Sequence, residues 1–364
     1  MGMPAAEEYR AAALADVRRA MEERRYDAFI LTDLPTIRWL TGFSGSSARL
    51  LVTSGLCRLF TDFRYREQAA AEAPGSETVV ISGTVASELA SGRHPLRGTV
   101  ALQSDSVGWL EATRLMEALS GRCRLEPVAG FFTPFRMVKN PFELERMQEA
   151  AAVSHRVLEA VVPMVSERVS ELDIAAEISC LHRKLGGEKD SFEPIVAGGV
   201  HSSMPHARPS GEHFREGSLV TIDMGCHVGG YASDQTRTVA LGRVPGEMRR
   251  VYDVVREAQA LGLRSARCGM RASELDALVR SFIAEEGYGE AFGHGLGHGI
   301  GLEVHEEPRI SPNGEVVLRE GMVFTIEPGI YLEGRFGVRI EDTVVLEAGG
   351  ARPLQRFPKE LLEL

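Results

Sequence analysis

The chain has 364 residues and the composition of an ordinary globular protein, with 44% hydrophobic residues, 25% charged residues and a formal net charge of -10 at pH 7. This length exceeds what one hydrophobic core usually serves, so two domains are expected. Residues 1–134 contain 15 of the 41 Lys and Arg residues and 16 of the 51 Asp and Glu residues. The remaining residues contain 26 Lys and Arg against 35 Asp and Glu, so the acidic excess lies there. The absence of a basic block argues against nucleic acid as a partner.

No run is long and apolar enough to cross a bilayer, and the N-terminus lacks the pattern of a secretory signal. We therefore expect no membrane contact and a cytoplasmic location. The five cysteines are odd in number, widely spaced and without a Cys-x-x-Cys pair, which indicates reduced thiols.

Helical and strand signals alternate through the first 130 residues. An amphipathic helix is predicted over residues 7–25, and Ser54-Gly55 between two apolar runs predicts a β-hairpin, so the sheet is expected to be mixed. This pattern indicates an α/β domain. The predicted strands are 28–32, 49–53, 57–61, 78–81 and 99–103, and the further predicted helices are 65–72, 85–89 and 110–119.

The alternation stops in the segment FFTPFRMVKNP, where prolines and basic residues separate apolar ones. We place the domain boundary there and expect an N-terminal domain of residues 1–134 and a C-terminal domain of residues 135–364. Asn140 then offers a helix N-cap, followed by Pro141 at the first helical position and Glu143 at the third. A long helix is therefore predicted to open the second domain.

The second domain shows the same order of predicted elements twice. Predicted helices at 141–162 and 171–185 precede one strand-rich region, and predicted helices at 246–267 and 273–286 precede another. The second helix of each pair carries a matching cap signal, Ser170 with Asp173 and Ser273 with Asp276. This repeated order suggests pseudo-symmetry between the two helix pairs and their strands.

Five potential metal ligands lie in apolar or glycine-rich stretches of the second domain, in TIDMG, YASDQT, GLGHGIGLE, VFTIEPG and VRIEDTVV. An isolated ionised group is costly to bury in such surroundings, whereas a bound cation neutralises it. Each residue alone is better explained as a polar group at a strand end or turn, but five in similar settings favour one shared site. The five are Asp223, Asp234, His298, Glu327 and Glu341.

Four carboxylates and one imidazole form an oxygen-rich donor set that suits Mn²⁺, Co²⁺, Fe²⁺ or Zn²⁺ better than a structural thiolate zinc site would. Because four negative charges match two divalent ions better than one, two metal ions per chain are predicted, with Mn²⁺ preferred and Co²⁺ or Zn²⁺ as alternatives. Two ions about 3.5–4 Å apart share a hydroxide, lower its pKa and polarise the carbonyl group that it attacks. This chemistry predicts hydrolysis of an amide or ester bond.

Residues 292–301 interleave imidazoles with glycines, which lets the backbone approach a ligand closely. They do not satisfy G-x-G-x-x-G, and the chain contains neither G-x-x-x-x-G-K-[S/T] nor H-E-x-x-H, so nucleotide sites and single-zinc zincin sites are not indicated. Three histidines fall within twelve positions, which favours a functional role over satisfied surface or core histidines. They are His294, His298 and His305.

This combination of motifs resembles the pita-bread metallopeptidases, the family of methionine aminopeptidase, aminopeptidase P and prolidase, over nearly the whole chain. The resemblance implies an α+β protein in which an α/β creatinase-type N-terminal domain precedes a C-terminal pita-bread (creatinase/aminopeptidase) fold. It also implies a role for each metal ligand. Asp223 is expected to bind the first metal ion, and His298 and Glu327 the second. Asp234 and Glu341 are expected to bridge both ions.

The same resemblance implies roles for residues beside the metal ligands. His206, in SSMPHARP, and His305, in LEVHEE, are expected to bind substrate and to stabilise the tetrahedral intermediate. Glu327 is expected to shuttle a proton for the bridging hydroxide. The substrate pocket and the groups that support it are expected to include His294, Tyr331 and Arg339.

Two N-terminal motifs, IRWLTGFSGS and FTDFRYREQA, resemble the creatinase-type domain of the proline-specific branch. The resemblance therefore implies a small peptide substrate with proline at the second position, and a homodimer. The leading expectation is an Xaa-Pro aminopeptidase, which removes the residue before proline. The alternative is an Xaa-Pro dipeptidase (prolidase), and a non-catalytic binding module on the same fold is a remote third.

One departure from the family pattern concerns the Pro-His motif. Many relatives continue this motif with Gly or Tyr, whereas here Ala207-Arg208-Pro209 follows His206. Arg208 has two possible roles. It is either a solvent-exposed loop residue without a function in binding, or it pairs with the carboxylate of a dipeptide. The second role is chemically reasonable because a guanidinium group pairs well with a carboxylate.

Overall fold

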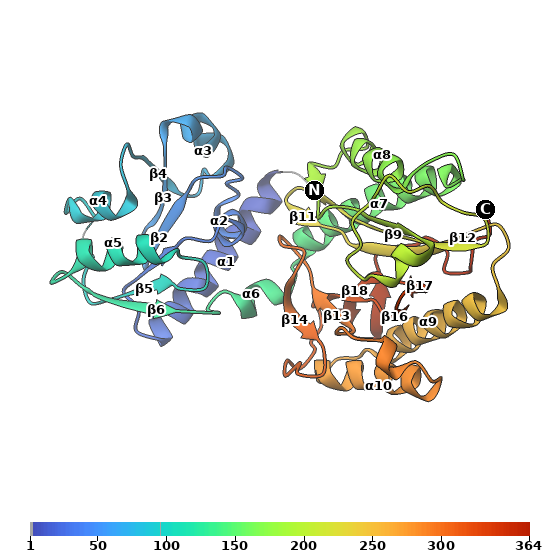
Figure 1. Cartoon of the computed structure of the whole chain (residues 1–364). Coiled ribbons are helices and arrows are strands. Elements are labelled where there is room, and N and C mark those ends of the chain that lie inside the picture. The colour runs from blue at the N-terminus through green and yellow to red at the C-terminus, as the bar shows by residue number, and fades with distance from the viewer. Residues whose placement is uncertain (1–2, 95) are drawn as a thin grey trace. The chain divides into compact units, whose positions relative to one another are not determined.

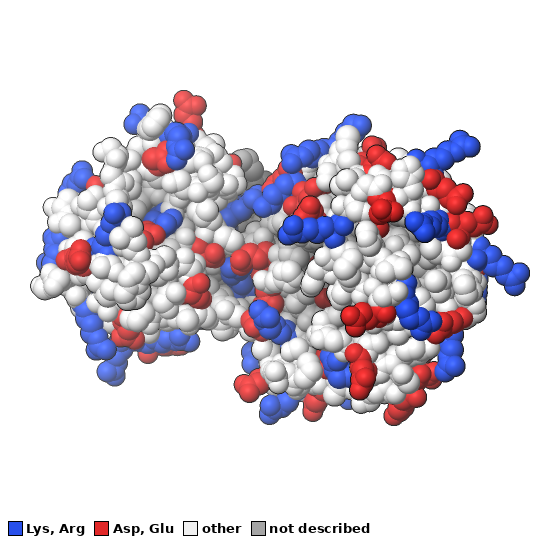
Figure 2. All heavy atoms as spheres, viewed as in Figure 1, with Lys and Arg blue, Asp and Glu red and all other residues white. Residues whose placement is uncertain are grey.

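The computed structural model describes residues 3–94 and 96–364 (Figure 1). Contacts divide the chain into two compact units, Met1–Arg136 and Met137–Leu364, called unit 1 and unit 2. Within the described residues, no helix combines the length and the apolar character that a membrane span requires. Figure 2 shows basic and acidic side chains interspersed on the visible face of each unit.

Unit 1 is built around a six-stranded mixed sheet with the strand order β4-β3-β2-β1-β5-β6. The hairpin predicted at Ser54-Gly55 is confirmed, because it joins β2 and β3 in antiparallel pairing. The pairs β1–β5, β5–β6 and β3–β4 are parallel. The strands are β1 (Ala28–Leu31), β2 (Arg49–Thr53), β3 (Cys57–Thr61), β4 (Glu77–Val80), β5 (Thr99–Gln103) and β6 (Arg124–Val128), of which β6 was not predicted.

The sequence pattern also did not predict helix α2 (Leu34–Thr41). Its N-cap is Asp33, whose carboxylate accepts a hydrogen bond from the Thr36 backbone N–H at 2.8 Å, and Pro35 lies in the first turn. An aspartate followed closely by proline is a helix start signal, and it could have identified this helix from the sequence. The other helices of this part are α1 (Met3–Glu23), α3 (Arg66–Glu72), α4 (Val85–Ala90), α5 (Trp109–Leu119) and α6 (Thr133–Met137).

Unit 2 begins with the long helix that the Asn140 cap predicts. The Asn140 side chain and Glu143 form a capping box at the start of α7, and Ser170 with Asp173 forms another at α8, so both predicted caps are confirmed. The four main helices are α7 (Pro141–Val161), α8 (Glu171–Lys184), α9 (Gly246–Ser265) and α10 (Ala272–Glu285).

The cap predicted from Ser273 and Asp276 is wrong. Helix α10 begins one residue earlier, so Arg271 is the N-cap and Glu274 is the third helical residue. Asp276 is instead buried and accepts hydrogen bonds from the Arg280 guanidinium at 2.8 and 2.9 Å and from the Leu296 backbone N–H at 2.9 Å. Its function in the fold is therefore to hold the glycine-rich segment against α10.

The strands of unit 2 form several short sheets. A three-stranded sheet has the order β12-β9-β8, and a five-stranded sheet has the order β14-β13-β15-β18-β19. The Glu341 backbone N–H donates to the Thr236 carbonyl at 3.1 Å and so links the end of β17 to β12. The strands that carry the site are β9 (Ser218–Met224), β12 (Gln235–Leu241), β13 (Gly297–Gly299), β15 (Val323–Ile326), β17 (Phe336–Arg339) and β18 (Asp342–Glu347).

The remaining strands of unit 2 support these six. They are β7 (Lys189–Asp190), β8 (Ile195–Gly198), β10 (Cys226–Val228), β11 (Tyr231–Ala232), β14 (Glu306–Ile310), β16 (Gly329–Leu332) and β19 (Gly350–Pro353). Strands β11 and β12 follow each other closely and are separated only by Ser233 and Asp234. This separation places Asp234 outside the regular ladder.

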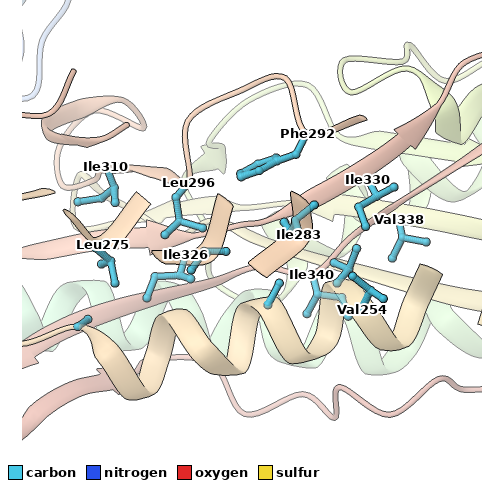
Figure 3. Close-up of a cluster of buried hydrophobic side chains, with 14 of the residues drawn as sticks. Val254, Leu275, Ile283, Phe292, Leu296, Ile310, Ile326, Ile330, Val338 and Ile340 are labelled. Carbon is cyan, nitrogen blue, oxygen red and sulfur yellow. The ribbon is translucent and has the colours of Figure 1, made fainter. Parts of the chain in front are cut away.

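Each helix pair packs into its own apolar cluster. Helices α7 and α8 share a buried apolar cluster with β9, whereas α9 and α10 share another with β15, β17 and β18. Figure 3 shows part of the second cluster, in which Ile326 and Ile340 point into the apolar layer beside α9. At Gly262 of α9, an added Cβ would lie 2.8 Å from the Ile326 Cγ2, so the helix approaches β15 closely. This packing supports the strand ends that carry Glu327 and Glu341.

Candidate metal centre

The five predicted ligands lie in strands of unit 2 or directly beside their ends. Asp223 is the penultimate residue of β9 and pairs in register with Thr236 of β12. Asp234 comes directly before β12, and Glu341 stands between β17 and β18. His298 is the central residue of β13, and Glu327 follows the last residue of β15. Antiparallel pairing therefore brings together residues that are far apart in the sequence.

Three of these residues already have the geometry of a ligand set. One donor atom from each of Asp234, His298 and Glu341 lies within 4.8 Å of the other two. The His298 Nε2 is 3.6 Å from the Asp234 Oδ2 and 3.3 Å from the Glu327 Oε1. The His298 Nδ1 is 3.1 Å from the Gly299 carbonyl, which can only accept, so Nδ1 carries a proton, and in the neutral ring Nε2 can bind a cation that the carboxylates also hold.

Three of the carboxylates each have one oxygen without a hydrogen-bond partner among the described residues. Asp223 Oδ1, Asp234 Oδ1 and Glu341 Oε1 are buried and accept no hydrogen bond from any residue that the structure describes. Burial raises the pKa of Asp234 and of Glu341 well above their ordinary values, and neighbouring carboxylates raise both further. Burial likewise raises the pKa of Glu327. Burying a carboxylate oxygen without a hydrogen-bond partner costs free energy, and bound cations would supply the missing partners. The carboxylate set therefore fits bound cations.

One guanidinium group faces this cluster. Arg339 is buried and donates to Asp223 Oδ2 at 2.6 Å, to the Thr236 hydroxyl at 3.1 Å and to the Tyr331 hydroxyl oxygen at 2.8 Å. It also donates to the Pro205 carbonyl at 3.1 Å. A single positive charge cannot balance four carboxylates, so Arg339 does not replace the cations that the site fits.

Hydroxyl and amide groups donate hydrogen bonds to the predicted ligand residues. The Thr236 hydroxyl donates to Glu341 Oε2 at 2.6 Å, and the Thr325 hydroxyl donates to Glu327 Oε1 at 3.2 Å. The Asp234 carbonyl accepts from the Thr343 hydroxyl at 3.0 Å and from the Gln355 side chain at 2.8 Å. Sequence reasoning did not identify Thr325, Thr343 or Gln355, because their partners are known only once the strands are paired.

The cluster lines a cavity of about 610 Å³. His206, His294 and His305, for which the resemblance implies contact with substrate, also line it. The imidazole rings of His298 and His305 are 4.4 Å apart between centroids. Tyr331 does not line the cavity; its hydroxyl group instead lies 3.1 Å from the His294 Nε2 and accepts from Arg339. Tyr331 therefore supports two residues that do line it.

The cavity wall includes residues that sequence reasoning missed. Arg309, near the end of β14, lines the cavity together with Arg208, and both side chains are exposed. Phe192, Pro194 and Val304 add apolar surface. The one sequence signal for Arg309 was its position four residues after His305, which does not by itself distinguish a cavity group from a surface arginine.

Two family models match the chain. The model of the Creatinase/Prolidase N-terminal domain matches residues 14–138, and that of Metallopeptidase family M24 matches residues 145–348, which is more than half of the chain. The chain belongs to metallopeptidase family M24. The family that the motifs resemble is thereby confirmed, and so is the predicted architecture of a creatinase-type domain followed by a pita-bread domain.

Relatives of this M24 chain carry two kinds of name. An Xaa-Pro dipeptidase of Pyrococcus horikoshii is 33% identical over 94% of the chain and 96% of its own length. The solved structure of an Xaa-Pro dipeptidase from Bacillus anthracis is 34% identical, with a TM-score of 0.93 over 98% of this chain and 100% of that one. An X-Pro aminopeptidase from Thermotoga maritima is also 34% identical, with a TM-score of 0.90 over 96% and 99%.

Membership of family M24 makes the protein a metallopeptidase and implies that it uses a divalent metal. The buried, unpartnered carboxylate oxygens provide the structural reason why a cation fits here. Metal identity and metal count belong to the proposal that follows.

Proposed function

We propose that the protein is an Xaa-Pro dipeptidase, which hydrolyses the bond between a first residue and a proline that ends the peptide. The observation that carries this proposal is the pair of exposed guanidinium groups, Arg208 and Arg309, in the same cavity as the carboxylate cluster. A dipeptide places its terminal carboxylate one residue beyond the scissile bond, and guanidinium binds carboxylate in a bidentate manner. The names of two relatives support the same choice.

This proposal reverses the order of the two leading expectations. The sequence favoured an Xaa-Pro aminopeptidase with the dipeptidase as alternative, but a cation pair in the cavity suits a substrate that ends at proline. The Arg309 Nε lies 3.8 Å from the Glu307 Oε1, and the two side chains are 75% and 40% exposed, so this ion pair is weak. A substrate carboxylate can therefore displace Glu307 at low cost. The aminopeptidase remains the second candidate because of the Thermotoga maritima relative.

For the metal centre we propose two divalent ions, Mn²⁺ first, held by the five predicted ligands. Asp223 would chelate one ion, His298 and Glu327 the other, with Asp234 and Glu341 shared between both. When bound, such ions act as Lewis acids on the scissile carbonyl and generate a hydroxide nucleophile from water at neutral pH. The donor set supports the proposal because its oxygens are hard ligands and the imidazole suits the same metals.

The protein's own side chains would supply the remaining steps. Glu327 Oε1 lies 3.3 Å from the His298 Nε2, and from this position the carboxylate would take up a proton and pass it to the leaving proline nitrogen. His206 and His305 line the cavity on loops outside the carboxylate cluster, where they would bind the substrate and stabilise charge on its carbonyl oxygen. His294, oriented by Tyr331, would border the first residue of the substrate.

The choice between dipeptidase and aminopeptidase predicts a clear difference in turnover. The purified protein, loaded separately with Mn²⁺, Co²⁺ and Zn²⁺, is expected to cleave Xaa-Pro dipeptides and to leave Xaa-Pro-Yaa tripeptides essentially uncleaved, because only the dipeptide places a carboxylate at the two guanidinium groups. Chromatographic separation of the products measures both rates. Preferential cleavage of the tripeptides would identify an aminopeptidase instead. Absence of bound metal and of any cleavage after Mn²⁺ addition would favour the non-catalytic module.

A second prediction concerns the arginines themselves. Arg309→Ala and Arg208→Ala are each expected to raise KM for an Xaa-Pro dipeptide by about 10- to 100-fold, since a hydrogen bond to a charged group contributes about 1.5–3 kcal/mol. Arg319→Ala is the matched control, because Arg319 is exposed on the same unit but does not line the cavity. If neither cavity variant changes KM, the dipeptide carboxylate is bound elsewhere.

The homodimer that the resemblance implies also stays a prediction. Sedimentation of the purified chain over a range of concentrations measures it, and a species of one chain mass at all concentrations would contradict it.

A further inference from the structure

One buried carboxylate contacts both ends of the segment that carries His206. Glu171, the first residue of α8, is 2% exposed. Its Oε1 accepts from the Gly198 backbone N–H at 2.8 Å, and its Oε2 accepts from the Ser210 backbone N–H at 3.0 Å and from the Ser210 hydroxyl at 2.7 Å. We call residues 198–210 the His206 loop. A single side chain thus joins the point where this loop leaves β8 to the point where it returns.

A third position of the loop contacts the same carboxylate. The His201 Nδ1 lies 3.0 Å from Glu171 Oε2 and 3.1 Å from Oε1, and because the carboxylate accepts, the ring nitrogen donates. The backbone of α8 adds a hydrogen bond from the Leu172 N–H to the Ser210 carbonyl at 3.0 Å. Hydrogen bonds to an ionised acceptor are about twice as strong as neutral ones. Glu171 is therefore the main polar anchor at the base of the loop.

The His206 side chain has no such anchor of its own. Within residues 3–94 and 96–364, no hydrogen bond or ion pair holds its imidazole ring, which is exposed and lines the cavity. The middle of the loop is held through its backbone, by the bond from Arg339 to the Pro205 carbonyl. The position of the His206 ring in the cavity therefore follows from the position of the loop backbone.

We propose that Glu171 is a positioning residue for His206. Glu171 does not line the cavity, so it acts on the reaction through the loop and not by contact with substrate. The role of His206 rests on the proposed function, whereas the clamp on the loop does not. Glutamine at this position keeps the size of the side chain but replaces one acceptor oxygen with an N–H₂ group, which cannot accept from Gly198 or Ser210. The loop must then shift to satisfy these partly buried donors.

The variant Glu171→Gln tests the clamp without any substrate. Backbone amide hydrogen exchange within residues 199–209 is expected to be faster than in the wild type, in the metal-free and the Mn²⁺-loaded protein alike, with exchange in β9 and β12 unchanged. Glu177→Gln is the matched control, because it makes the same chemical change on the same helix away from the loop. Unchanged exchange across the loop in Glu171→Gln overturns the proposal.

Turnover of an Xaa-Pro dipeptide tests the consequence for His206. Glu171→Gln is expected to lower kcat by about 10- to 100-fold, since displacing a reacting group by about 1 Å has an effect of that size. Mn²⁺ affinity should equal that of the wild type, because Glu171 contacts no proposed ligand. In a chain that already carries His206→Ala, the same substitution is expected to lower kcat by less than about 2-fold, as coupled residues are not additive.

Equal losses of kcat in the two backgrounds would overturn the positioning role, because Glu171 would then act on the fold as a whole. If the wild type cleaves no Xaa-Pro dipeptide, the proposed function fails, and the exchange measurement still decides whether Glu171 clamps the loop.

Discussion

Asp234→Ala is expected to lower turnover of an Xaa-Pro dipeptide by about 1,000-fold or more and to remove most Mn²⁺ binding. Asp234 is a proposed shared ligand, with one oxygen that accepts no hydrogen bond and another 3.6 Å from the His298 Nε2. Metal ions contribute several kcal/mol of transition-state stabilisation, and about 1.4 kcal/mol corresponds to tenfold in rate. Calorimetric titration with Mn²⁺ and a turnover assay measure the two effects.

The fold is expected to survive this substitution. The Asp234 carbonyl, not its carboxylate, is held by Thr343 and Gln355, so the backbone keeps its hydrogen bonds. The raised pKa of Asp234 means that its ionised form opposes folding at neutral pH. Removing it should therefore leave the metal-free protein at least as stable as the wild type, whereas stabilisation by added Mn²⁺ should be lost.

Asp253→Ala is the control for this prediction, because Asp253 is exposed on α9 and pairs with Arg256 at the surface. It is expected to bind Mn²⁺ and to turn over substrate as the wild type does. Near-normal turnover in Asp234→Ala would refute the assignment of Asp234 as a shared ligand.

Arg339→Met is expected to destabilise the metal-free protein by about 3 kcal/mol. Breaking a buried ion pair by removal of one partner leaves an uncompensated charge, at a cost of about 3–5 kcal/mol. Here the partner is Asp223, 2.6 Å from the guanidinium in a site that holds three further carboxylates. The bonds from Arg339 to Tyr331 and to the Pro205 carbonyl are lost as well. Urea unfolding in the presence of a chelator measures the change.

Added Mn²⁺ should stabilise Arg339→Met more than it stabilises the wild type, because the bound cations then replace the missing positive charge. Arg352→Met is the matched control: Arg352 pairs with Glu347, both side chains are about half exposed, and such pairs contribute about 0–1 kcal/mol. A loss below about 1 kcal/mol in Arg339→Met would mean that the neighbouring carboxylates become protonated and that Arg339 does not balance their charge.

The elements of the fold were largely predictable because their signals are local. Caps such as Asn140 with Glu143, and Ser170 with Asp173, act over three residues, and the hairpin at Ser54-Gly55 is formed by its own neighbours. Predictions were wrong or absent where the hydrogen-bond partner of a residue lies far away in the sequence. Asp276 looks like a capping residue but accepts from Leu296, twenty positions away, and thereby holds the glycine-rich segment.

By itself, the sequence determined the donor types of the candidate site and the family, because ionisable residues in apolar stretches and their neighbouring motifs are visible without coordinates. Only the tertiary structure decided which groups meet. Arg339 reaches Asp223 across 116 positions, and Thr236 reaches Glu341 across 105. The same holds for Arg309 in the cavity and for Glu171 at the base of the His206 loop. Partners of this kind depend on how strands pair and helices pack, and side-chain periodicity along one element carries no information about them.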